Sequence, residues 1–128
     1  MKYSKKGLEK RKKDREGFKE FFEKHVNKIK QEKLTCEECG DRLKGNASEI
    51  AHCLPKQKFK SIATNDKNVL YLCGMYSNNQ CHSKFDTSSN EVFRDMKVFK
   101  KANAVFEELK EAITENINYK EEDRYGNP

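Results

Sequence analysis

The sequence predicts a small α+β domain in which two short strands and a helix form the centre, between N-terminal and C-terminal helical segments. Three observations lead to this prediction. Apolar residues recur at helical spacing towards both ends of the 128-residue chain, two short apolar runs lie near its middle, and the cysteines cluster around those runs. Hydrophobic residues make up 34% of the chain and charged residues 38%, so the core is small and an additional cross-link is expected.

The first predicted unit, residues 1–33, is a basic arm that leads into an amphipathic helix. It contains 13 lysine and arginine residues against 6 acidic ones. Such a basic end favours a polyanion partner, with nucleic acid first, although a solvated helix face is the alternative. The arm is expected to fray, and its predicted nucleic-acid contacts are Lys10, Arg11, Lys12, Lys13 and Arg15. The apolar helix face is expected to comprise Phe18, Phe21, Phe22, Val26 and Ile29, with His25 at the surface.

The second predicted unit, residues 34–90, contains the two strands, at Glu49–Leu54 and Val69–Leu72, and a helix that begins near Cys81. Residues 91–118 form the third unit, a C-terminal helix. Its apolar stripe is expected to pack in the core, against the N-terminal helix, or less favourably to form a dimer seam. The stripe comprises Val92, Met96, Phe99, Phe106, Leu109 and Ile113. The polar tail, residues 119–128, is expected to be disordered.

Four of the five cysteines have the spacing of metal ligands. Cys36 and Cys39 form a C-x-x-C pair followed by Gly40, and Cys73 and Cys81 form a second, wider pair. Four thiolates complete a closed tetrahedral zinc site, so we expect structural Zn²⁺ here; unrelated reduced cysteines are the alternative. The loop between the second pair must bulge outwards. Cys53 remains as a small buried apolar side chain.

Polar residues accompany the two apolar runs in a fixed order. His52 lies in the first run, Asn68 precedes the second, and His82 follows Cys81. This order, bracketed by cysteine pairs over 36–88, resembles the HNH (ββα-metal) endonuclease family. The resemblance implies a ββα-metal core and a DNA endonuclease that hydrolyses phosphodiester bonds, with His52 as the general base.

A second metal ion is predicted in the same region. His82 and Asp86 are four residues apart, which places them side by side on a helix, where they can chelate catalytic Mg²⁺ or Mn²⁺. An ordinary helix-surface contact is the alternative. Asn68 is expected to hold the loop between the strands through bonds to the backbone, or to be a plain turn residue.

One position departs from the family pattern. Many members carry Asp or His directly before the base histidine, whereas this chain has Ala51, which cannot coordinate an ion. The ion is then expected to depend on His82, Asp86, phosphate oxygens and water, which Mg²⁺ tolerates. Ala51 is also compatible with a chain of this family type that has lost its catalytic activity.

The partner is therefore predicted to be DNA, held without sequence readout by the basic arm and by Lys56, Lys58 and Lys60. The alternatives are a catalytically inactive zinc module that binds nucleic acid and a zinc-stabilised protein-interaction domain. The sequence shows no secretory signal and no membrane span, so a cytoplasmic protein is expected, as a monomer or weak dimer. A stand-alone nuclease of this kind would suit a phage or a mobile element.

Overall fold

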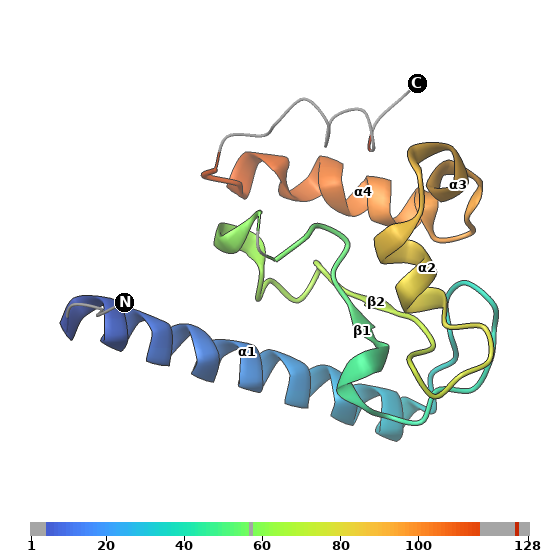
Figure 1. The fold of residues 1–128 in the computed structure, drawn as a ribbon, viewed down its shortest axis with the longest axis horizontal. Helices are drawn as coiled ribbons and strands as arrows, with labels where there is room; N and C mark the ends of the chain where they lie inside the picture. Colours follow the sequence, from blue (N-terminus) through green and yellow to red (C-terminus); the bar gives the residue numbers. More distant parts are fainter. Residues whose placement is uncertain (1–4, 57, 116–124, 126–128) are drawn as a thin grey trace.

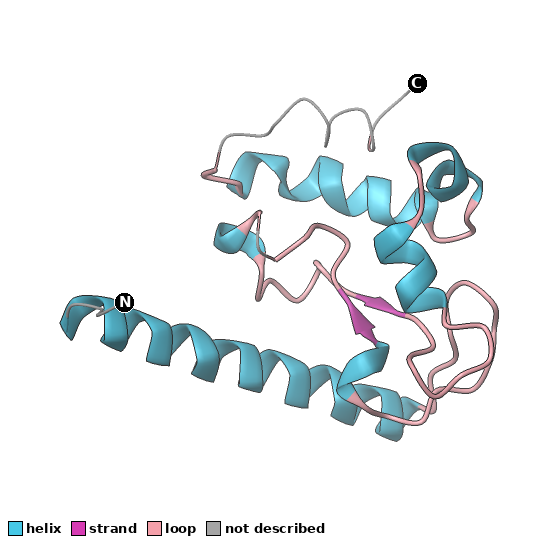
Figure 2. Ribbon diagram, in the orientation of Figure 1, coloured by secondary structure: helices cyan, strands magenta, loops and turns pink. Residues whose placement is uncertain are grey.

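The protein is a mixed helical domain with one small antiparallel sheet. The computed structural model describes residues 5–56, 58–115 and 125. Its elements, with 3-10 helices labelled η, are α1 (Lys5–Glu32), η1 (Ala47–Glu49), β1 (Ile50–Ala51), η2 (Lys60–Ile62), β2 (Leu70–Tyr71), α2 (Cys81–Thr87), α3 (Asn90–Asp95), α4 (Phe99–Leu109) and η3 (Lys110–Ala112). The α+β class and the strand, strand, helix order are thereby confirmed. Figure 1 shows α1 on one side of the sheet and α4 on the other, and Figure 2 shows how little of the chain is strand.

Helix α1 has an exposed half and a docked half. Its 28 residues correspond to a length of about 42 Å at 1.5 Å per residue. The described side chains of residues 9–16 are all exposed, whereas Phe21 and Ile29 are buried. The basic arm expected to fray is therefore helical from Lys5 onwards, because it continues a helix that is held by tertiary contacts further along the chain.

His25 was wrongly expected at the surface. It lies one helical turn from both Phe21 and Ile29, so it belongs to the buried face, and only 3% of its surface is exposed. Its Nδ1 is 2.7 Å from the hydroxyl of Tyr71 in β2. Its Nε2 lies 3.3 Å from Asp66, without the alignment of a hydrogen bond. Burial outweighs the charge of Asp66 and lowers the pKa of His25.

The sheet is shorter than the apolar runs indicated. Its register pairs Ile50 with Tyr71 and Ala51 with Leu70. Before β1 the chain forms η1, and after Ala51 it leaves the sheet. Beyond Ala51, the backbone N–H of Leu54 donates to the side chain of Asn68 and its carbonyl accepts from the same side chain, instead of bonding to a neighbouring strand. His52 therefore directly follows β1 instead of lying within a strand.

The predicted single C-terminal helix is two helices with a break. Met96 has an extended backbone, with φ −69° and ψ 146°, and α4 begins after Val98. The carboxylate of Glu38, far away in sequence, accepts the backbone N–H groups of Lys97 and Val98, at 3.0 Å each. This contact stabilises the start of α4, and the break at Met96 shifts the phase of the apolar stripe between the two helices.

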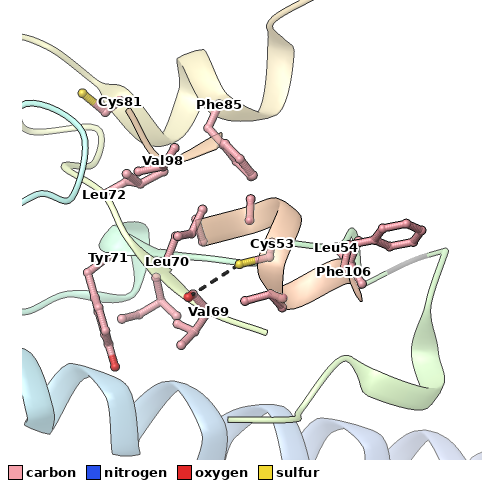
Figure 3. Close-up of a cluster of buried hydrophobic side chains, with 14 of the residues drawn as sticks. Cys53, Leu54, Val69, Leu70, Tyr71, Leu72, Cys81, Phe85, Val98 and Phe106 are labelled. Carbon is pink, nitrogen blue, oxygen red and sulfur yellow. Dashed lines mark hydrogen bonds between the residues drawn. The ribbon is translucent and has the colours of Figure 1, made fainter. Parts of the chain in front are cut away.

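Because of that shift, Val92 is 54% exposed, contrary to the prediction, and its neighbour Phe93 is fully buried. The predicted packing of this stripe against α1 is also wrong, since α4 lies across the sheet from α1 (Figure 1). The core instead gathers around β2 and the start of α2, where Leu70, Leu72 and Phe85 meet Val98 and Phe106 (Figure 3).

Most of the polar tail, 119–124 and 126–128, lies outside the described residues, but Tyr125 does not. Its side chain is 2% exposed and stacks on Phe106, with ring centroids 5.1 Å apart. The Tyr125 ring also makes an edge-on contact with Phe93. Its hydroxyl donates to the backbone carbonyl of Cys53, next to His52. The expectation of a disordered tail is therefore wrong at Tyr125.

None of the helices in the described parts of the chain combines the length and the apolar content that crossing a bilayer requires.

We predict that Tyr125→Phe lowers the free energy of unfolding by about 1–2 kcal/mol, because it removes a buried hydrogen bond to a carbonyl and retains the packed ring. Chemical denaturation measures this loss. Tyr76→Phe is the matched control, since Tyr76 is 69% exposed and should leave stability unchanged. Equal stability of Tyr125→Phe and the wild type would contradict the buried placement of Tyr125.

Candidate metal centre and active-site cleft

The four predicted cysteine ligands converge on one point. The sulfurs of Cys36, Cys39, Cys73 and Cys81 all lie within 4.8 Å of one another. Cys39 Sγ and Cys73 Sγ are 3.8 Å apart, too far for a disulfide bond. A tetrahedral ion with metal–sulfur distances near 2.3 Å needs sulfurs about 3.8 Å apart. The cluster therefore fits a single metal ion, and its all-sulfur donor set is consistent with zinc.

Local backbone geometry aims the first pair of thiols. Gly40 has φ +83°, a left-handed conformation that allows the chain to reverse after Cys39. The backbone N–H of Cys39 points at Cys36 Sγ, 3.5 Å away, and that of Cys81 points at Cys73 Sγ, 3.3 Å away. Such N–H groups stabilise negative charge on sulfur. Burial raises the pKa of Cys73, but hydrogen bonds from Ser77 and Cys81 outweigh it and lower the pKa to about 7.

The two residues between the first cysteines connect the cluster to the rest of the fold. Glu37 makes two hydrogen bonds to Tyr71 of β2: its backbone N–H donates to the Tyr71 carbonyl at 2.9 Å, and its side-chain carboxylate accepts the Tyr71 N–H at 2.8 Å. The same carboxylate pairs with Lys101 of α4 at 2.5 Å. Together with the contact of Glu38 at the start of α4, these bonds join the cysteine turn to both the sheet and the C-terminal helix.

Cys53 stands apart from the metal cluster, as expected. It is 1% exposed and its thiol donates to the carbonyl of Val69 (Figure 3). Burial raises the pKa of this thiol to about 12. Cys53 therefore acts as a small neutral core residue.

Two of the three predicted catalytic residues, His52 and His82, share one cleft with Asp86, whereas Asn68 is buried outside its lining. The volume of the cleft is about 620 Å³, and it is lined by His52, His82 and Asp86 together with Lys56, Lys58 and other residues. Each histidine comes from a different element: His52 follows β1 and His82 is the second residue of α2. The fold thus brings together side chains that are 30 residues apart in the sequence.

His52 is held in one orientation. Its Nε2 lies 2.9 Å from the carbonyl of Ala63, to which it donates in the neutral ring, so that Nδ1 carries the lone pair. The ring stacks on Phe21 of α1 with centroids 5.2 Å apart and meets the edge of Phe22. Burial lowers the pKa of His52 to about 4, against an ordinary value of 6.5, so the ring is neutral at physiological pH.

Asn68 fixes both segments that hold His52. It is completely buried, and its Oδ1 accepts the N–H of Leu54 at 2.7 Å. Its Nδ2 donates to the carbonyls of Leu54 at 3.1 Å and Ile62 at 3.3 Å. Leu54 lies two residues after His52, and Ile62 precedes the Ala63 carbonyl that receives the imidazole. These bonds match the loop-holding arrangement predicted from the sequence.

His82 and Asp86 form the expected pair on α2. The Nδ1 of His82 is 2.6 Å from the carbonyl of Ser48, and its Nε2 is 3.2 Å from Asp86 Oδ2. In the neutral ring, donation from Nδ1 leaves the lone pair on Nε2, the nitrogen that faces Asp86, so the imidazole and the carboxylate are placed to bind one ion together. Burial disfavours the protonated ring, but the contacts with Asp86 and Ser48 outweigh it and raise the pKa of His82.

The predicted DNA-contact residues fall into two groups. Lys56 and Lys58 are exposed at the cleft, and Lys56 lies over the rings of Phe18 and Phe22, at 5.3 and 5.4 Å. Lys60 is exposed in η2 and is absent from the cleft lining. Lys10, Lys12, Lys13 and Arg15 are exposed on the projecting half of α1. The side chain of Arg11 lies outside the described ones.

Several groups that build the cleft were missed by sequence reasoning. Tyr125 lines it from the far end of the chain, and the carbonyls of Ser48 and Ala63 orient the two histidines. Phe21 and Phe22 were assigned to the core, without their contact with His52. An aromatic residue in a polar tail was a weak signal for Tyr125, since Tyr119 stands in the same tail, whereas backbone carbonyls leave no signal in a sequence.

Comparisons with models of known protein families, with curated proteins and with solved structures gave no match.

We predict one tightly bound metal ion per chain, zinc by its ligand type, which elemental analysis of the purified protein will measure. Cys36→Ser should unfold or aggregate the protein, because ion binding at such sites contributes ~10 kcal/mol or more to folding. Cys53→Ser is the control, since the Cys53 thiol is buried outside the cluster and this change should leave the ion content unchanged. A folded wild-type protein without bound metal would refute the assignment.

Proposed function

We propose that the protein is a metal-dependent DNA endonuclease with a structural zinc at the four cysteines. The observation that carries this proposal is the shared cleft of His52, His82 and Asp86, in which one nitrogen of each histidine is tied to a backbone carbonyl. Fixing one ring nitrogen sets the tautomer and leaves the other available for chemistry. The arrangement supports the resemblance to the HNH family that the motif order suggested.

In this proposal His52 is the general base. Its Nε2–H is committed to Ala63, so Nδ1 accepts the proton of a water that attacks the phosphodiester. The low pKa makes His52 a weak base, but it guarantees that the lone pair is present at neutral pH. The stacked ring of Phe21 and the bonds of Asn68 prevent the imidazole from turning away.

His82 and Asp86 are proposed to hold a catalytic Mg²⁺ or Mn²⁺. The ligand set fits such an ion, since it combines an oriented imidazole with an adjacent carboxylate that is 57% exposed and can accept further ligands. A bound ion would stabilise the charge that develops on the leaving oxygen. Lys56 and Lys58, at the rim of the same cleft, would position the backbone phosphates.

Ala51 favours a second candidate function, a catalytically inactive zinc module that binds nucleic acid. Ala51 is completely buried in β1 beside His52, so this position contributes no ligand to an ion. A carboxylate introduced there would have to enter a closed apolar environment, which is costly. An assay of cleavage therefore decides between the two functions.

We predict that the purified protein cleaves plasmid DNA with Mg²⁺ or Mn²⁺. His52→Ala should slow cleavage roughly 10²–10⁴-fold, because the general base is lost, and it should retain zinc and DNA affinity. His82→Ala should abolish cleavage through loss of the ion, and Asp86→Ala should reduce it strongly. Agarose-gel assays of nicked and linear products measure these rates.

Asp95→Ala is the matched control for Asp86→Ala, since Asp95 is exposed at the end of α3 and does not line the cleft. The pH profile adds a further check. With an ordinary histidine pKa near 6.5, the cleavage rate would rise with pH as the general base loses its proton. Because the pKa of His52 is about 4, this rise should occur near pH 4, and deprotonation of His52 should not raise the rate between pH 6 and 8. If no divalent ion supports cleavage of duplex, nicked, branched or single-stranded DNA, the inactive binding module is the better account.

DNA binding should weaken steeply with salt. Lys56→Gln combined with Lys58→Gln should flatten the slope of log affinity against log salt by about 1.8, if each lysine contacts one phosphate. Lys97→Gln combined with Lys100→Gln removes the same charge from exposed positions that do not line the cleft. Fluorescence anisotropy across a salt series measures both slopes. Equal slopes for the two pairs would contradict binding at the cleft.

A further inference from the structure

The loop between Cys73 and Cys81 carries an exposed apolar pair that the catalytic proposal does not use. Among the described residues, three large hydrophobic side chains are strongly exposed: Met75 at 65%, Tyr76 at 69% and Val92 at 54%. Single exposed apolar residues are ordinary, but Met75 and Tyr76 are adjacent in a chain with little apolar material. Their place in the structure gives them a specific neighbour.

Met75, the first residue of the pair, lies next to the proposed ion ligands. A second depression, of about 370 Å³, is lined by Met75 together with His82 and Asp86. The main cleft is lined by His52 together with the same His82 and Asp86. His82 and Asp86 thus stand between the two depressions. A phosphodiester placed at these residues, with His52 on one side, extends its flanking nucleotides towards Met75 on the other.

The loop is held in place rather than left free. Gly74 packs so closely on Ser48 that a Cβ there would lie 2.1 Å from the serine hydroxyl. The carbonyl of that same Ser48 orients His82. Further along, Asn79 donates to Asp41 at 3.0 Å. The loop and the imidazole therefore share one anchor, which fixes the distance from the apolar pair to the proposed reaction centre.

The charge around Tyr76 suits a nucleic acid. Lys44 donates to the Tyr76 carbonyl at 3.4 Å, and its ammonium group lies 5.8 Å from the centroid of the tyrosine ring. A cation beside an exposed aromatic ring is the combination with which proteins bind single-stranded nucleic acid, since the cation contacts phosphate and the ring stacks on a base. Methionine serves elsewhere as an apolar wedge between base steps.

We propose that Met75 and Tyr76 stack on unpaired or unstacked bases next to the scissile phosphate, so that the protein prefers DNA with locally disrupted pairing to a regular duplex. This inference rests on the proposed endonuclease function, because it places the scissile phosphate at His82 and Asp86. The cysteine loop is then longer than metal binding requires because it also forms a platform for bases.

Binding of matched DNA probes tests the inference. Zinc-loaded His52→Ala protein is used as the background, so that cleavage does not obscure binding. The probes are a fully paired duplex and the same duplex with a short mismatched bubble. The preference for the bubble, measured by fluorescence anisotropy, should be roughly 5- to 150-fold, in line with one stacked base. Met75→Ser combined with Tyr76→Ser should abolish the preference and leave affinity for the paired duplex nearly unchanged.

Val92→Ser is the matched control, because it removes the remaining strongly exposed apolar side chain from a different depression. An unchanged preference in the Met75/Tyr76 variant, or an equal loss in Val92→Ser, would overturn the inference. The inference would also fail if the Met75/Tyr76 variant kept the preference but differed from its parent in oligomeric state, as measured by light scattering. That result would assign the pair to a contact between proteins. If the preference depends on Met75 and Tyr76 but the wild type cleaves no DNA, the proposed endonuclease function fails and the base platform stands. Cleavage without any preference would overturn the base platform alone.

Discussion

Four cysteine sulfurs converge within 4.8 Å of one another, and the other elements of the fold are held in place around them. This convergence brings together two chain segments that are 34 residues apart, at Cys39 and Cys73, in a protein whose sheet has two residues in each strand. Such a sheet is too short to be stable alone. The residues between the first pair extend this constraint outwards, because Glu37 binds β2 and α4 while Glu38 stabilises the start of α4. Loss of the cluster would therefore release the sheet and the C-terminal helix together.

The geometry of the cleft depends in part on the cysteine cluster. His82 follows the ligand Cys81, and its N–H donates to the carbonyl of Cys73, another ligand. The cysteine cluster thus fixes the position of the first turn of α2, and with it the position of the His82 side chain. His52 is positioned from the other side, by Asn68 and by the carbonyl of Ala63. One ring nitrogen of each histidine bonds to a backbone carbonyl, which cannot rotate as a side chain does, so both rings have a fixed orientation.

Helix α1 has separate tasks along its length. Its docked half covers the sheet and supplies Phe21, on which His52 stacks, and His25, which contacts Tyr71. Its projecting half is basic and exposed, and it needs no core of its own because the docked half propagates the helix. Lys56 links the helix to the cleft through its contacts with Phe18 and Phe22.

Helical periodicity and the two short apolar runs predict the α+β class, the cysteine spacing predicts the four cysteines that lie together, and the resemblance in motif order predicts a helix that begins near Cys81. The sequence also identified His52, His82, Asp86 and Asn68, whose side chains the structure brings to one cleft or its supporting loop. The sequence did not predict where the strands end, where the C-terminal helix breaks, or that His25 and Tyr125 are buried. These features depend on contacts between distant residues: Glu38 with the start of α4, Asn68 with Leu54, and Tyr125 with Cys53. Local patterns carry no information about such partners, because the free energy of each contact arises only when the chain is folded.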